Sequence, residues 1–141
     1  MKKLITIKDG ILQVEKVLKT DYKTLLNLLE NVDTLTCATR KIGDHHYDIW
    51  LDDEGLLKND ELTCSAIAID NSNEALVGNL VIANYDMEGN TIGLEDEDIK
   101  EIIDNFIVAK HKENVLTYDT SCGIKKLILK EDAGFLCYCI N

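Results

Sequence analysis

Hydrophobic and polar residues alternate loosely along the first part of the chain, over residues 2–8 and 11–17. This period of two residues predicts a pair of strands. Asp9-Gly10 lies between them and is a dipeptide typical of a two-residue hairpin turn. Thr20 then predicts the N-cap of an amphipathic helix over residues 21–31. The apolar face of that helix is formed by Tyr22, Leu25, Leu26 and Leu29.

Beyond this helix, the pattern predicts further strands and one more helix. The expected strands cover residues 34–42, 45–52, 63–70 and 75–85. Gly43-Asp44 predicts a turn between the first two of them, and Gly78 indicates a bulge in the last. A second amphipathic helix is expected from Asp96 to Lys110, with an apolar face of Ile99, Ile102, Ile103 and Phe106. Residues 115–141 are strand-rich, with a hairpin joining 125–130 to 135–140.

The chain has 141 residues, a length typical of one domain. Its elements predict an α+β fold, in which two amphipathic helices cover one face of an antiparallel sheet of several strands. A C-terminal β-hairpin completes the expected fold. We expect a single domain over residues 1–141, with a core over 1–112 and a strand-rich extension over 113–141.

The net charge of −11 is concentrated in the middle of the chain. Residues 44–104 carry 17 acidic and two basic residues, a net charge of −15. Residues 95–98 are all acidic and begin the second helix, where the helix dipole favours carboxylates. Lys110, His111 and Lys112 suit the same dipole at its expected other end. Arg40 is the only arginine, which argues against direct nucleic-acid readout, because that readout relies on bidentate arginines.

Residues 48–62, DIWLDDEGLLKNDEL, hold six carboxylates and one lysine. Alternation along the expected strand 45–52 places Ile49 and Leu51 on one face, which we expect in the core. The other face carries His46, Asp48, Trp50 and Asp52. We expect this face in water or against a partner, since buried unpaired carboxylates are costly and Trp is common at interfaces. The expected acidic binding face is Asp48, Trp50, Asp52, Asp53, Glu54, Asp60, Glu61, Asp86 and Glu88.

Two frames of the acidic region approach the pattern of a calcium-binding loop, and each fails at a required position. In the first frame Trp50 stands where a ligand is needed, and in the second Thr91 stands where glycine is needed. No nucleophile elbow, phosphate-binding glycine loop or metalloprotease motif occurs in the sequence. We therefore expect no cofactor, no specific metal site and no enzymatic activity.

The five cysteines are odd in number, and Cys37, Cys64 and Cys122 are widely spaced, which predicts reduced thiols in the core. Cys137 and Cys139 share one side of a strand and supply at most half of a zinc site, because no ligand pair completes it. No apolar run is long enough for a membrane span, and the start MKKLITIKDG is a poor signal peptide. We expect a cytoplasmic protein.

Several segments together resemble one family. They are the N-terminal hairpin, the Leu-rich helix, IWLDDEGLLKNDEL, and ALVGNLVIANYDMEGNTIGLEDEDIKEIIDNF. Residues 1–107 resemble the bacterial and phage family catalogued as domain of unknown function 3846. The resemblance is carried by Asp53 to Leu57, by Val77 to Asn79, and by a glycine-containing turn before an acidic helix start. The chain departs from the family pattern at Asp60-Glu61-Leu62, where Asn and small apolar residues are expected.

The resemblance implies no catalytic residue, but it implies a setting: phages and conjugative elements, near genes that blunt host defences. The leading expectation is a non-enzymatic interaction protein that uses residues 44–104 as an acidic face. It would inhibit a basic nucleic-acid-binding host-defence protein, in the manner of anti-restriction or anti-CRISPR proteins that mimic DNA. One alternative is a small-ligand binding protein with a pocket near Trp50 and Gly78, in some oligomeric form. Another is a metal-assisted enzyme that uses the carboxylates of residues 48–54.

Overall fold

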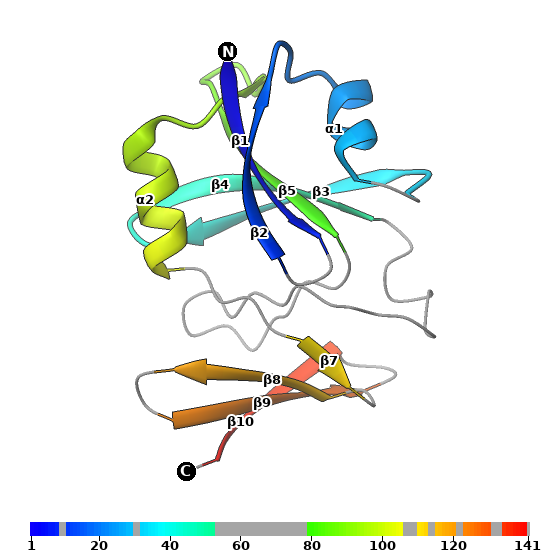
Figure 1. Ribbon diagram of the computed structural model, residues 1–141, viewed down its shortest axis with the longest axis vertical. Helices are drawn as coiled ribbons and strands as arrows, with labels where there is room; N and C mark the ends of the chain where they lie inside the picture. Colours follow the sequence, from blue (N-terminus) through cyan, green and yellow to red (C-terminus); the bar gives the residue numbers. More distant parts are fainter. Residues whose placement is uncertain are drawn as a thin grey trace.

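The structure, a computed structural model, describes residues 1–8, 11–29, 32–52, 79–105, 110–112, 115–120, 123–130 and 134–140. It has an α+β fold with two antiparallel sheets and two helices (Figure 1). The first part of the chain forms β1 Lys2–Lys8, β2 Ile11–Val17, α1 Tyr22–Leu28, β3 Leu35–Ile42, β4 His45–Asp52, β5 Leu80–Tyr85, β6 Thr91–Ile92 and α2 Asp96–Asn105. The second part forms β7 Lys110–Lys112, β8 Val115–Thr120, β9 Gly123–Lys130 and β10 Gly134–Ile140.

The first sheet has the strand order β2-β1-β5-β4-β3, and the short β6 pairs with the end of β5. The two hairpins predicted for this sheet are confirmed: Lys8 pairs with Ile11 across the first turn, and Ile42 pairs with His45 across the second. β5 lies between β1 and β4, although it is distant from both in sequence (Figure 1). Four consecutive residues of β5 are buried, Leu80 to Ala83, because both faces of the sheet are covered.

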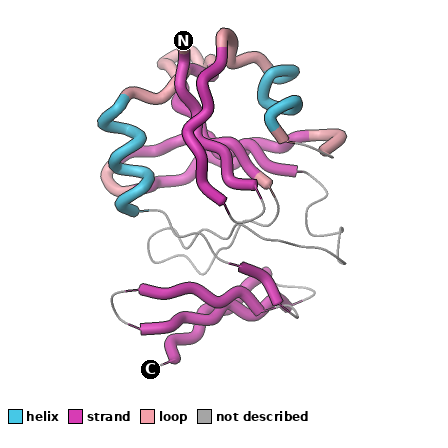
Figure 2. The backbone as a smooth tube through the Cα atoms, in the orientation of Figure 1, coloured by secondary structure: helices cyan, strands magenta, loops and turns pink. Residues whose placement is uncertain are grey.

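Each face of this sheet has its own helix and its own apolar cluster. α2 contributes Ile102 to a cluster that includes Ile5 and Ile49, and α1 contributes Leu25 to a cluster that includes Leu4 and Val81. Neighbouring residues of one strand therefore enter different clusters, as strand alternation requires. The expectation that both helices cover one face is wrong: they lie on opposite sides of the sheet (Figure 2).

The helix boundaries differ from those expected. α1 is capped by Asp21 rather than Thr20, since the Asp21 carboxylate accepts a hydrogen bond from the Thr24 amide at 2.9 Å. The Thr20 hydroxyl instead donates to the carbonyl of Thr91. α2 begins at Asp96 as predicted, but residues 110–112 form strand β7 rather than the end of that helix.

The second sheet has the order β10-β9-β8-β7, and all its pairings are antiparallel. β9 pairs with β10, from Lys130 opposite Gly134 at one end to Ile124 opposite Ile140 at the other. Within the part of the chain that the structure describes, no helix is long and apolar enough to cross a membrane. The predicted strand over 63–70 and Gly78 lie outside the described residues.

Candidate functional site

The predicted acidic binding face does not form on β4 as expected. Asp48 and Asp52 are only 9 % and 7 % exposed, so the expectation that they are exposed is wrong. The reason is that α1 covers this face of the sheet, with Leu25 and Leu29 in the cluster beneath it. Asp48 accepts a hydrogen bond from the Thr39 hydroxyl at 2.8 Å, which offsets part of the cost of its burial. Asp53, Glu54, Asp60 and Glu61 lie outside the described residues.

Trp50 also points to the covered face rather than outward. Its ring packs against the α1 cluster and makes an edge-to-face contact with Tyr22, with ring centroids 6.3 Å apart. The indole Nε1 is buried without a hydrogen-bond partner. Trp50 is therefore mainly a packing residue in the described part of the chain, and the expectation that it faces a partner is wrong.

The two remaining members of the predicted face lie in the turn between β5 and β6. Asp86 is half-buried and holds the turn, because its carboxylate accepts hydrogen bonds from the amides of Glu88 and Asn90 at 2.9 and 2.8 Å. Gly89 has a φ of 84°, a left-handed conformation that the turn requires. Glu88 is exposed at the turn, as predicted.

Exposed carboxylates gather instead on α2 and on this turn. We call this set the α2 acidic surface, and its members are Glu88, Glu95, Asp96, Glu97 and Asp104. Among the described residues, the one cation paired with it is Lys3, whose Nζ lies 2.7 Å from Asp96 Oδ1. The two groups are exposed, so this ion pair adds little stability. Lys100 is also exposed on α2, and six carboxylates against this one lysine leave residues 95–104 with a net negative charge.

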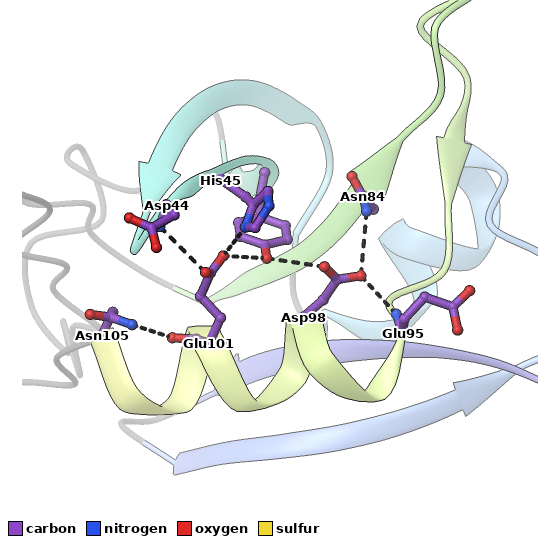
Figure 3. A network of polar contacts seen from close by, with 8 residues as sticks. Asp44, His45, Asn84, Glu95, Asp98, Glu101 and Asn105 are labelled. Atoms are coloured by element: carbon purple, nitrogen blue, oxygen red, sulfur yellow. Dashed lines mark hydrogen bonds and ion pairs between the residues drawn. The ribbon is translucent and has the colours of Figure 1, made fainter.

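A polar network joins the inner side of α2 to the start of β4 (Figure 3). Glu101 is its centre: one carboxylate oxygen lies 2.7 Å from His45 Nδ1 and 2.8 Å from the Tyr47 hydroxyl. The other oxygen accepts from the Asp44 amide at 3.4 Å. Gly43, with a φ of 67°, makes this approach possible, since a Cβ there would lie 2.7 Å from Glu101 Cγ.

Asp98 extends the network toward β5. It accepts from the Tyr47 hydroxyl at 3.1 Å, from the Asn84 side-chain amide at 3.4 Å and from the Glu95 amide at 2.9 Å (Figure 3). The bond to Glu95 closes the first turn of α2, in the manner of a capping box. All three donors are neutral, so the negative charge of Asp98 has no cationic partner among the residues described.

The charges of this network shift the pKa of its members. Burial raises the pKa of the Tyr47 hydroxyl far above its usual value, and the neighbouring carboxylates Glu101 and Asp98 raise it further. The Glu101 hydrogen bond and charge raise the pKa of His45. Burial acts to raise the pKa of Glu101, but hydrogen bonds from Tyr47 and His45 outweigh it and lower that pKa. Tyr47 is therefore a neutral donor, and the site keeps its negative charge near neutral pH.

A pocket of about 330 Å³ opens beside the network. It is lined by Asp44, His45, His46, Tyr47, Asn84, Tyr85 and Asp98. Most of these side chains are polar, two are imidazoles and two are aromatic phenols. The pocket suits a polar or charged ligand better than an apolar one. It does not lie at Trp50 as the small-ligand alternative supposed, and Gly78 is outside the described residues.

No group of three or more His, Cys, Asp or Glu side chains suited to a metal ion occurs among the described residues. Cys37 is a free thiol, but it is exposed on the edge strand β3, so the expectation of a core thiol is wrong for it. Partial burial of the thiol, together with the Asp48 charge, raises the pKa of Cys37 to about 11. Cys64 and Cys122 lie outside the described residues, as do the side chains of Cys137 and Cys139.

The sequence contains a signal for this site, which the interpretation of residues 48–62 as a binding face did not use. Asp98 and Glu101 are three residues apart, so they share one side of α2 with Ile102. His45 and Tyr47 share the core side of β4 with Ile49. Polar residues placed on the core side of two separate elements predict a buried polar contact between them. The number of acids in residues 48–54 carries no such information about which side chains meet.

The described residues thus define an antiparallel α+β protein with an acidic helix surface and a polar pocket. A family model described as Domain of unknown function (DUF3846) matches residues 2–107, most of the chain, and the chain belongs to this family. The match ends soon after α2, and the second sheet lies beyond it. Comparison with curated proteins and with solved structures gives no match.

Proposed function

We propose that this chain is a non-enzymatic binding protein whose α2 acidic surface docks on a basic, nucleic-acid-binding partner. One observation carries this proposal. Residues 79–105 contain eight carboxylates and a single lysine, and the five that form the α2 acidic surface are exposed. Such a surface, with a large excess of negative charge, attracts a cationic partner over a distance of about one Debye length, which is about 8 Å at physiological ionic strength.

Carboxylates are spaced more closely along α2 than they could be along one face of a strand, which brings their spacing nearer to that of the charges of a nucleic acid. Carboxylates on one face of a strand lie about 6.7 Å apart. Four carboxylates of the α2 acidic surface fall between Glu95 and Asp104, over a length of about 13.5 Å at about 1.5 Å per residue. That is one charge per about 3–4 Å, denser than one face of a strand and about half as dense as duplex DNA, with its one charge per about 1.7 Å. A partner with a phosphate-binding groove would meet about half the charge density of duplex DNA on this surface.

The proposed surface differs from the one expected from the sequence alone. Asp48 and Asp52 are excluded because they are buried, whereas Glu88 remains. The family resemblance implies phages and conjugative elements near genes that counter host defences. The partner we propose is therefore a host-defence nuclease with a lysine- and arginine-rich groove, which the chain would block by competing with DNA.

The test is capture of partners from a host lysate, followed by competition. The wild-type chain should retain a nucleic-acid-binding protein, and duplex DNA or rising salt should release it. Asp104→Lys should weaken capture, since it reverses one charge of the surface at the end of α2 where the helix dipole favours a cation. The triple variant Glu88→Lys, Glu97→Lys and Asp104→Lys should abolish it.

Asp33→Lys is the matched control. Asp33 is exposed, lies outside the α2 acidic surface, and its reversal changes the net charge by the same amount as Asp104→Lys. It should leave capture nearly unchanged. Equal losses in the two variants would show that total charge, rather than this surface, drives binding. Retention that duplex DNA does not compete with would contradict the proposal.

A further inference from the structure

The pocket lies where two neighbouring strands separate. β4 and β5 are paired from Leu51 opposite Leu80 to Asp48 opposite Ala83, and the pairing ends there. His45 to Tyr47 remain paired only with β3, while Asn84 and Tyr85 turn to pair with β6. The sheet therefore opens between β4 and β5 at this end, and the side chains that border the opening line the pocket.

The opening holds more negative charge than its hydrogen bonds neutralise. Tyr47 has one hydroxyl proton, yet the carboxylates of both Glu101 and Asp98 lie within 3.1 Å of its oxygen. A single proton can satisfy only one of these two acceptors at a time. Asp44, a third carboxylate, lines the same pocket and has no ion pair within the described part of the chain.

The N-terminus of α2 does not remove this excess. Its dipole is worth roughly half a positive charge, and four consecutive carboxylates, residues 95–98, already surround it. His45 and His46 both line the pocket, and when His45 is protonated its Nδ1 proton is directed to Glu101. A concave site lined by carboxylates concentrates its field, so a cation inside it would be held more strongly than one on the open helix surface.

From this geometry we infer a binding site for one organic cation, a guanidinium or primary ammonium group, in the pocket between β4, β5 and α2. Asp98 and Asp44 supply the counter-charge, and the Tyr85 ring supplies a face for cation–π contact. The Asn84 side-chain oxygen already accepts from the Tyr85 amide at 2.9 Å, and its second lone pair is the acceptor for the cation. An organic cation is favoured over a metal ion because no three metal-ligating side chains converge among the described residues. A planar or multi-donor group can instead satisfy acceptors spread around the pocket.

The cation has two sources with the same chemistry. It is either an arginine or lysine side chain of the macromolecular partner or a free small molecule. The first source rests on the proposed function, since it makes the pocket the anchor point beside the α2 acidic surface. The second source does not depend on that function.

The experiment is an NMR titration of the full chain with methylguanidinium and with methylammonium at millimolar concentration. Both probes carry the proposed group and little else. We expect amide shifts that saturate and cluster at residues 44–47, 84–85 and 98. Asp98→Asn keeps an acceptor for the Glu95 amide but removes the charge, and it should weaken probe binding about tenfold or more, as for loss of a charged hydrogen-bond partner.

Asp33→Asn is the matched control, because it removes one exposed carboxylate that lies outside both the pocket lining and the α2 acidic surface. It should change the affinity for the probe by less than about twofold, because solvent ions screen a surface charge that lies outside the pocket. Asp44→Asn provides a second pocket variant at an exposed position, in case Asp98→Asn unfolds α2. Equal losses in the pocket and control variants, or shifts that do not saturate, would overturn the inference.

The two sources are then separated. Saturating methylguanidinium that releases the captured partner identifies a partner side chain as the cation. Probe binding without release of the partner, together with a cationic small molecule on the purified chain in native mass spectrometry, identifies a free ligand. The triple variant of the α2 acidic surface should still bind the probe, so loss of partner capture alone refutes the proposed function and leaves the pocket intact.

Discussion

The two faces of the first sheet bury polar groups in different ways. On the α1 face, polar side chains form separate, partly buried hydrogen bonds: Thr6 donates to Glu15 at 3.0 Å, and Thr39 donates to Asp48 at 2.8 Å. On the α2 face, the polar groups of β4, β5 and α2 meet in one network around Tyr47. The first arrangement keeps its polar contacts apart and leaves the buried Trp50 indole Nε1 without a partner. The second leaves charge concentrated beside a pocket.

The difference follows from the helices. α1 contributes the apolar residues Leu25 and Leu29, which close its face around the sheet. α2 contributes Ile102 to the core but also turns Asp98 and Glu101 toward the strands. Networks of this kind are favourable only when their members are satisfied, and Asp98 has three neutral donors but no cationic partner among the residues described. The α2 face is therefore the one we associate with function.

The largest expected effect tests whether both helices are held by their apolar contacts. Leu25→Ala on the α1 face and Ile102→Ala on the α2 face should each lower the free energy of unfolding by about 2–5 kcal/mol, because each leaves a cavity in a buried cluster. Urea denaturation measures both. Ile103→Ala is the control on α2: Ile103 is 50 % exposed, and its truncation should cost less than about 0.5 kcal/mol. A small loss for Ile102→Ala would mean that α2 is not packed as described.

The next effect compares one tyrosine hydroxyl on each face. Tyr47 donates to carboxylates, so Tyr47→Phe should lower the free energy of unfolding by about 1.5–3 kcal/mol. The Tyr22 hydroxyl accepts from the neutral Leu35 amide, so Tyr22→Phe should cost only about 0.5–1.5 kcal/mol. The same denaturation experiment measures both variants. Equal costs would remove the distinction between the two faces.

A smaller effect is a pH dependence specific to the α2 face. Glu101 raises the pKa of His45, so the stabilisation from this pair is complete below pH 6.5, the unfolded value, and is lost as pH rises through the folded pKa above it. The pKa of Glu101 is lowered, so its part is present above pH 4.5 and is lost as pH falls through the folded pKa below it. The pair should therefore contribute most between these two values.

The measurement is the difference in Tm between wild type and His45→Gln over the range from pH 5.5 to 8.5. We expect the difference to shrink as pH rises, because the imidazolium that pairs with Glu101 is lost. His46→Gln removes the neighbouring exposed imidazole and serves as the control. A difference that grows with pH, or one that is the same for both histidines, would contradict the assigned contact.

The smallest effect concerns the α1 side of the sheet and does not involve stability. Because partial burial and then the Asp48 charge raise the pKa of Cys37 to about 11, the exposed thiol should react slowly with iodoacetamide near pH 8. Asp48→Asn should speed this reaction, since it removes a charge that opposes thiolate formation. Peptide mapping of the alkylated protein isolates Cys37 from the other cysteines. An unchanged rate in a folded Asp48→Asn variant would show that Asp48 does not act on the thiol.

The sequence by itself determined the local elements well. Alternation and the turn residues predicted β1, β2, β3 and β4 with nearly correct ends, and the acidic run at Asp96 marked the start of α2. These features depend on contacts between residues close in the chain, such as Lys8 with Ile11 or Ile42 with His45. Local backbone preference and side-chain periodicity are sufficient to specify contacts of this kind.

Only the tertiary structure decided which faces of those elements are covered. Alternation along β4 separates Asp48 from Ile49, but it cannot show that α1 covers the Asp48 side. The four-residue apolar run of β5 was the one local sign that both faces are buried. The network of Tyr47, Asp98 and Glu101 also requires β5 to enter between β1 and β4 and α2 to return over β4. These contacts join residues about 50 positions apart, and their positions follow from the packing of the whole sheet rather than from any local pattern.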